Sequence, residues 1–190
     1  RAECYDRLLG AETNYAELSS AEQRIARMLF VALWPDGGGF DSYDEGFERL
    51  REEREARSEL RQVVDIAFDE SRHPTTVLAD LPEVPLHVHA RYSREEILAA
   101  LDRGTLERKP AHFREGVLHT TIDGRPIDAF VITLRKSEAD YSPTTLYRDY
   151  PLSPTLFHWE SQSTTSVDSP TGRRYRDGSS TILLFVRRER

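Results

Sequence analysis

Apolar residues in the first part of the chain recur at every third or fourth position, which predicts helices. Ser19 or Ser20 begins one of them, because Glu22 or Gln23 follows three positions later as in a capping box. The residues on its buried face are Ile25, Met28, Leu29 and Ala32. A second helical pattern covers residues 43–50 and resumes at residues 60–68. The charged run at residues 51–59 either joins these two segments into one helix or separates them.

From Leu81 the pattern of apolar residues changes to a period of two, which is typical of strands. Residues 86–91 form the first predicted strand, with His87, His89 and Arg91 on the same side. A short helix follows, which Ser93 and Glu96 cap reciprocally. Further strands are predicted at residues 116–122, 126–134, 156–162 and 181–188. Asp-Gly at 123–124 predicts a hairpin between the first two of these.

This order of elements predicts an α+β protein. We expect a helical subdomain at residues 1–80 and a β-rich domain at residues 81–190. The second domain is expected to be a small, mostly antiparallel, barrel-like sheet with one interposed helix, of the kind found in PUA and SRA domains.

The net charge of −7 is distributed unevenly along the chain. Residues 1–80 hold 18 acidic and 10 basic side chains, whereas residues 81–190 hold 15 acidic and 16 basic ones. The near-neutral second part argues against a polycation that coats phosphates. Arginine outnumbers lysine by 24 to 2, which suits bidentate contacts but is also explained by genome composition. The single Cys4 excludes an intramolecular disulfide.

Neither a membrane-spanning run nor a signal sequence is recognisable. We therefore expect a cytoplasmic protein without a membrane partner, cut from a longer chain because it has no initiating methionine.

The sequence contains no motif of a known catalytic centre. Phosphate-binding loops and the Gly-x-Ser-x-Gly element are absent, so no nucleotide cofactor is expected. His87 and His89 are weak metal candidates, since alternate strand residues share a side. The available carboxylates do not have the spacing of common nuclease cores: Asp123, Asp128, Asp140, Asp149, Glu160 and Asp168. On a strand, Glu160 would also face away from Ser161, so we expect no catalytic residue.

Aromatic residues interleaved with arginines are the strongest functional signal. They supply stacking surfaces and phosphate donors together, which is what binding an unstacked base requires. The candidates for stacking are Trp159, Tyr150 and Tyr175. The candidates for phosphate contacts are Arg148, Arg173 and Arg174, and Ser161 and Ser163 add hydroxyls on the side of Trp159. The competing interpretation is that Phe157 and Trp159 belong to the core.

Five segments carry a family resemblance: LHVHARYSREEIL at 86–98, PIDAFVITLRK at 126–136, YRDY at 147–150, FHWESQS at 157–163 and LLFVR at 183–187. Over residues 84–188 the chain resembles an uncharacterised domain at the C-terminus of bacterial superfamily 2 DEAD/DEAH-type helicases. Some of these helicases carry a phospholipase-D-like nuclease, and several occur near phage-defence genes. The resemblance implies a helicase motor N-terminal to residue 1, DNA as the ligand, and a barrel completed by strands beyond residue 188.

Three hypotheses follow. The first is a non-catalytic DNA-binding module that directs a helicase or nuclease in phage defence, with modified or distorted DNA as a candidate ligand. The second is a protein-interaction or regulatory domain that packs on the helicase motor through the acidic helical part. The third is a metal-dependent nuclease that uses His87 and His89.

Overall fold

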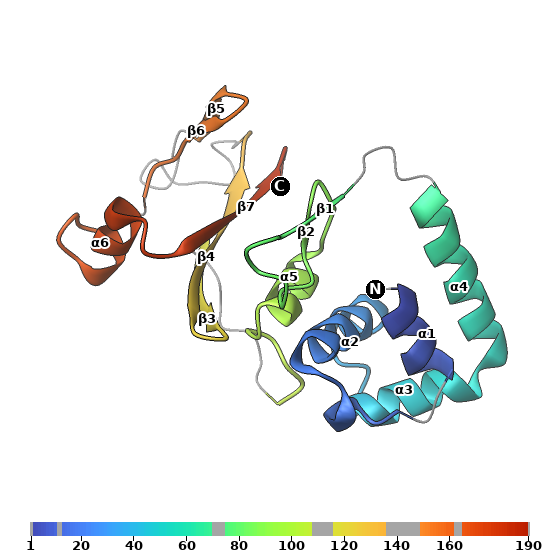
Figure 1. Cartoon of the computed structure of the whole chain (residues 1–190). Helices are drawn as coiled ribbons and strands as arrows, with labels where there is room; N and C mark the ends of the chain where they lie inside the picture. The colour runs from blue at the N-terminus through green and yellow to red at the C-terminus, as the bar shows by residue number, and fades with distance from the viewer. Residues whose placement is uncertain are drawn as a thin grey trace. The chain divides into compact units, whose positions relative to one another are not determined.

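The computed structural model describes residues 2–10, 13–69, 75–107, 116–135, 149–161 and 165–189. The chain forms two compact units, unit 1 at residues 1–111 and unit 2 at residues 112–190. Unit 1 contains most of the helices, and unit 2 contains the longer strands (Figure 1). The α+β class is thereby confirmed. No helix among the described residues is long and apolar enough to cross a membrane.

Unit 1 begins with the helices that the apolar pattern predicted. Ser19 is the N-cap of α2 and forms a complete capping box with Glu22, so Ser19 rather than Ser20 begins the helix. The charged run proves to separate two helices, because the backbone leaves the helical conformation at Glu53. The bounds are α1 Ala2–Gly10, the 3-10 helix η1 Tyr15–Glu17, α2 Ser20–Leu33, α3 Tyr43–Glu52 and α4 Arg54–Asp69.

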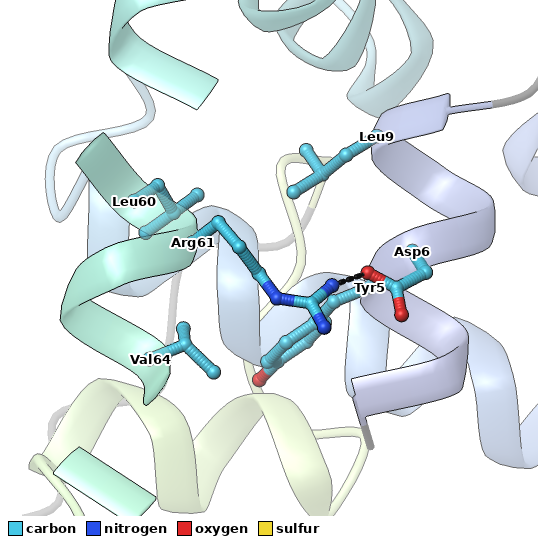
Figure 2. Close-up of a pocket in the computed structure, with 6 residues that line it drawn as sticks. All are labelled: Tyr5, Asp6, Leu9, Leu60, Arg61 and Val64. Atoms are coloured by element: carbon cyan, nitrogen blue, oxygen red, sulfur yellow. Dashed lines mark hydrogen bonds and ion pairs between the residues drawn. The ribbon is translucent and has the colours of Figure 1, made fainter. Parts of the chain in front are cut away.

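The core of unit 1 is built around Phe30 of α2, which is fully buried against Leu8 and Phe47. Gly46 of α3 permits this packing, because a Cβ there would lie 2.5 Å from the Phe30 ring. Away from the core, α1 and α4 enclose a cavity of about 20 Å³ (Figure 2). An ion pair between Asp6 and Arg61 joins the two helices beside it.

The chain after α4 also belongs to unit 1. It forms a hairpin of two short strands, β1 Thr76–Val77 and β2 His87–Val88, and then helix α5 Arg94–Ala100. Ser93 and Glu96 form the predicted capping box of α5. Because α5 packs on α2, the structural division falls at residue 111 and differs from the predicted boundary at residue 80.

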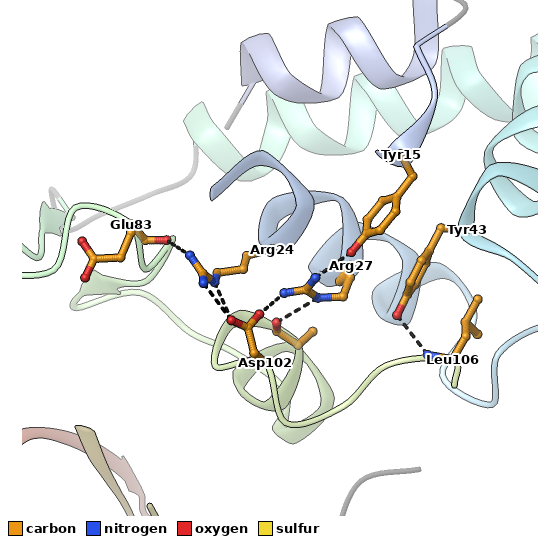
Figure 3. Close-up of polar contacts among 8 residues, drawn as sticks. Tyr15, Arg24, Arg27, Tyr43, Glu83, Asp102 and Leu106 are labelled. Carbon is orange, nitrogen blue, oxygen red and sulfur yellow. Dashed lines mark hydrogen bonds and ion pairs between the residues drawn. The ribbon is translucent and has the colours of Figure 1, made fainter. Parts of the chain in front are cut away.

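Two buried arginines of α2 hold the end of α5 (Figure 3). Arg24 donates to Asp102 from Nε at 3.0 Å and from Nη2 at 2.7 Å, and Arg27 donates to the other carboxylate oxygen. Arg27 also donates to the hydroxyl of Tyr15 and to the carbonyl of Ala99. The two guanidinium groups thus share one carboxylate, and α5 is fixed to the helical core.

Unit 2 is organised around a three-stranded sheet with β4 in the centre. Strands β3 and β4 form the predicted hairpin, in which Asp123 and Gly124 adopt φ values of 48° and 79°. Strand β7 pairs with β4 in parallel, and a separate hairpin of β5 and β6 precedes helix α6. The bounds are β3 Val117–Ile122, β4 Arg125–Thr133, β5 Tyr150–Ser153, β6 Leu156–His158, α6 Pro170–Asp177 and β7 Thr181–Arg187.

The structure shows no closed barrel among the described residues. Their strands form three separate sheets of two, three and two strands, and none closes on itself. The mostly antiparallel character holds, since three of the four strand pairings are antiparallel.

Two predicted strands are shorter than expected. His89 has a φ of 69°, which ends β2 after Val88, so His87 and His89 are not alternate residues of one strand. Strand β6 ends at His158, and the argument from strand alternation therefore does not extend to Trp159 and its successors. Between the strands predicted at residues 156–162 and 181–188 the structure also contains helix α6, which Ser169 caps and Pro170 begins.

Candidate functional site

Asp128 is fully buried in strand β4, which is an uncommon place for a carboxylate. Arg174 of α6 donates to its two carboxylate oxygens from Nε at 2.8 Å and from Nη2 at 3.1 Å. The hydroxyl of Ser180 donates to it as well. His119, its partner in register on β3, places Nδ1 3.0 Å from the carboxylate. Four elements of chain thus meet at one buried carboxylate.

The charges of this cluster stabilise one another. Burial raises the pKa of Asp128, but the hydrogen bonds from Arg174 and Ser180 and the charges of Arg174 and His119 outweigh burial and leave the pKa below its ordinary value. The hydrogen bond to Asp128 likewise raises the pKa of Arg174. Asp128 and Arg174 therefore form an ionised pair, whose bidentate geometry fixes α6 on the sheet.

An aromatic cluster adjoins this ion pair on the same face of the sheet. Phe130 lies two positions beyond Asp128 on β4 and stacks against Trp159, with ring centroids 4.2 Å apart. Tyr175 of α6 meets both rings edge-on, at 5.5 Å from Phe130 and 5.2 Å from Trp159. Phe130 is buried, whereas Trp159 and Tyr175 are half-buried. Trp159 thus packs in the cluster and keeps part of its surface in solvent. This position is compatible both with a core residue and with a residue that stacks on a base.

Helix α6 carries three arginines, and one of them, Arg174, lies 5.5 Å from the ring centre of Tyr175. Arg173 is exposed, Arg174 is half-buried on Asp128, and exposed Arg176 pairs with Asp177 at 2.8 Å. A tight approach fixes the start of the helix, because a Cβ on Gly172 would lie only 2.0 Å from the carbonyl oxygen of Ser166.

The other predicted site residues are placed less centrally. Tyr150 of β5 is 44% exposed and stacks on His158, with ring centroids 4.7 Å apart. Ser161 is half-buried. Arg148 and Ser163 lie outside the described residues. The structure therefore brings Trp159, Tyr175 and Arg174 together, whereas Arg173 precedes Arg174 on the exposed side of α6.

The sequence reasoning missed the centre of this arrangement. Asp128 was counted only among scattered carboxylates, and His119, Phe130 and Ser180 were not selected. One signal was present: Asp128 stands within the mostly apolar segment IDAFVIT at residues 127–133, and a charged residue is seldom buried unless it is paired. Its principal partner, Arg174, lies 46 residues away and could not be identified by spacing.

Unit 1 contains a groove, but few polar side chains that could bind a ligand or a metal line it. A groove of about 160 Å³ lies between α2 and the β1–β2 segment, and apart from His87 its lining is apolar. The imidazole Nδ1 of His87 lies 3.0 Å from the Thr75 hydroxyl. In the part of the chain that the structure describes, no three His, Cys, Asp or Glu residues converge as metal ligands.

A comparison with family models matches residues 86–190 to a domain of unknown function, DUF3427. The chain belongs to this family. No curated protein and no solved structure matches it significantly.

The DUF3427 match does not coincide with the compact units. It covers all of unit 2, and it also includes β2, α5 and Asp102 of unit 1. The candidate site around Asp128 therefore lies wholly within the family segment. In contrast, the arginines that hold Asp102 precede that segment.

Proposed function

We propose that unit 2 is a non-catalytic nucleic-acid-binding module with DNA as its ligand. The observation that carries the proposal is the half-buried pair of Trp159 and Tyr175, packed on Phe130, with exposed Arg173 two positions before Tyr175 on α6. A rigid aromatic surface stacks on a base at low entropic cost, and an adjacent guanidinium binds the phosphate that follows it. Unit 2 holds 11 basic and 10 acidic residues, so such binding depends on this local cluster rather than on net charge.

Arg174 has a different role from Arg173 in this proposal. Its guanidinium donates twice to Asp128 and lies 5.5 Å from the ring centre of Tyr175, so it braces the aromatic surface. Arg173, on the exposed side of α6, supplies the phosphate contact. Tyr150 on the β5–β6 hairpin supplies a second stacking position.

The wider setting of the proposal rests on the sequence resemblance. The module would belong to a cytoplasmic bacterial helicase, in some cases with a nuclease, and would direct that motor to modified or distorted DNA in phage defence. The motor of the same polypeptide would then be its permanent partner.

The test is a binding panel with the whole chain. Modified and unmodified, single-stranded and double-stranded DNA are compared at two salt concentrations. We expect Trp159→Ala to weaken binding about 5- to 150-fold, the loss of one stacked base, without a change in salt slope. Arg173→Gln should weaken binding to all sequences and reduce the slope by about 0.7 to 0.9.

The matched control is Arg176→Gln on the same helix, because Arg176 is already paired with Asp177. It should change affinity less than Arg173→Gln does. Thermal unfolding of each variant separates lost contacts from lost folding. Unchanged affinity in both Trp159→Ala and Arg173→Gln would refute this assignment of the site.

A specific observation favours one alternative, a protein-interaction role for unit 1. Val63 and Ile66 on α4 are 60% and 55% exposed, and α4 also carries acidic side chains. If the chain fails to shift any DNA at low salt but binds an added helicase motor, and Val63→Ser with Ile66→Ser abolishes that binding, the interaction role is favoured.

A further inference from the structure

His119 occupies a special position at the edge of the Asp128 cluster. Its side chain is 41% exposed, and Nδ1 faces the buried carboxylate. An ionised carboxylate only accepts hydrogen bonds, so Nδ1 carries the proton in the neutral imidazole. The second ring nitrogen, Nε2, is then a bare acceptor, and protonation of the imidazole converts it into a cationic donor.

We propose that His119 is a phosphate contact, which binds a phosphate oxygen through Nε2–H when the imidazole is protonated. As a contact to DNA, this inference rests on the proposed function of unit 2. It adds a residue that neither the sequence motifs nor the aromatic cluster selected, and it makes binding dependent on pH.

The charge balance of the cluster supports this role. Arg174 already neutralises Asp128 through two hydrogen bonds, so a proton on His119 gives the cluster a net charge of about +1. Without Arg174, the carboxylate would cancel the imidazolium and leave nothing for an anion. The neighbours of His119 on the same face of β3 are Val117 and Thr121, which are uncharged. Among the described residues, Asp128 and Arg174 are therefore the charged groups that bear on it.

Position also favours a ligand contact over a purely structural bond. His119 lies on the same sheet face as Phe130, which carries the Trp159 ring. Asp128 already accepts from Arg174 and Ser180, and these bonds satisfy both of its oxygens without His119.

The deciding variant is His119→Asn. An asparagine amide can replace Nδ1 as the donor to Asp128, but it has no group at the position of Nε2. It thus preserves the structural bond and removes the proposed contact. The matched control is His89→Asn in unit 1, because His89 is exposed and asparagine tolerates its positive φ.

The main experiment measures the affinity of the whole chain for an oligothymidylate of about 12 nucleotides. Thymine does not titrate between about pH 5.5 and about pH 8, the range in which imidazole does. We expect the native chain and His89→Asn to bind up to about tenfold more weakly per pH unit as pH rises through this range. His119→Asn should show a flat profile. A pH-independent native chain, or a variant with the native profile, would overturn the inference.

A second measurement distinguishes this inference from the proposed function. The NMR signal of His119 is titrated with pH in inorganic phosphate and in chloride of equal ionic strength. Phosphate should move the midpoint to higher pH. If this occurs but no DNA binds, His119 serves another phosphate ligand and the DNA proposal fails. If DNA binds with the same affinity at every pH, and phosphate leaves the midpoint of the His119 titration unchanged, the DNA proposal stands and this inference fails. If neither DNA nor phosphate binds, both fail.

Discussion

The two units each contain an arginine–aspartate cluster, but they bury opposite partners. In unit 1 the side chains of Arg24 and Arg27 are only 5% and 8% exposed, while that of Asp102 is 38% exposed. In unit 2 Asp128 is 0% exposed, while Arg174 and His119 are 18% and 41% exposed. The cluster of unit 1 therefore exposes its carboxylate more than its cationic groups, and the cluster of unit 2 exposes its cationic groups more than its carboxylate.

This difference separates a structural cluster from a candidate site. In unit 1 the arginines also donate to the carbonyls of Glu83 and Ala99 and to Tyr15. Their donors are therefore engaged in contacts that fix α5 on α2. In unit 2 the buried carboxylate orients groups that still reach solvent. A buried anion whose partner His119 still reaches solvent is suited to binding an anionic ligand, whereas the reverse arrangement serves stability.

The sharpest test of the comparison removes each carboxylate. Asp102→Ala leaves two buried guanidinium groups without a counterion and also strains the backbone, because Asp102 has a φ of 56°. We therefore expect unit 1 to lose about 3–5 kcal/mol of unfolding free energy, most of it from the lost counterion. Asp128→Ala should cost unit 2 about 1–3 kcal/mol, because Arg174 and His119 can turn toward water. The chain has two tryptophans, Trp34 in unit 1 and Trp159 in unit 2, so urea unfolding followed in single-tryptophan variants reports on each unit.

The control for these substitutions is Asp65→Ala. Asp65 forms an exposed pair with Arg61 on α4, and such pairs contribute about 0.3–0.5 kcal/mol. Equal losses for Asp102→Ala and Asp128→Ala would contradict the idea that the buried partner decides the cost.

The next effect concerns how α6 is held above Asp128. Gly172→Ala forces a methyl group against the backbone carbonyl of Ser166, and we expect a loss of about 1–3 kcal/mol in unit 2 together with weaker DNA binding. Gly10→Ala is the matched control in unit 1, because no atom lies within 4 Å of the added Cβ. If Gly172→Ala leaves both stability and binding unchanged, the position of α6 does not matter for the site.

The smallest expected effect is a loss of stability of unit 2 in acid, which is absent at neutral pH. The folded-state pKa of Asp128 is depressed, so its contribution to stability is present above the ordinary pKa of about 3.9 and is lost as pH falls through the folded value. Unit 2 should therefore lose stability as pH falls below about 4, followed by Trp159 fluorescence in urea. Asp128→Asn should flatten this dependence, and an equally steep profile in the variant would assign the acid sensitivity to other groups.

The parts of the fold that sequence predicted correctly are those that follow local rules. The capping boxes at Ser19 and Ser93 and the Asp123–Gly124 turn each depend on residues within three positions of one another. The predicted barrel and the predicted extension of β6 depended on pairing with distant chain, and the structure shows neither of them among the described residues. Helix α6 was missed although Ser169 and Pro170 signal its start, because its own sequence is too polar to show an apolar face.

The same limit applies to the candidate site. Residue types alone selected Trp159, Tyr175, Arg173 and Arg174 as a group, and the structure places Trp159 and Tyr175 in contact. They did not reveal that Arg174 is engaged by Asp128, or that His119 shares that carboxylate, because these partners are 46 and 9 residues away from Asp128. Sequence thus fixes which side chains are available and which short segments fold. Which charge is buried and which remains in water depends on long-range packing, since only the folded chain sets the exposure that gives an ion pair its role.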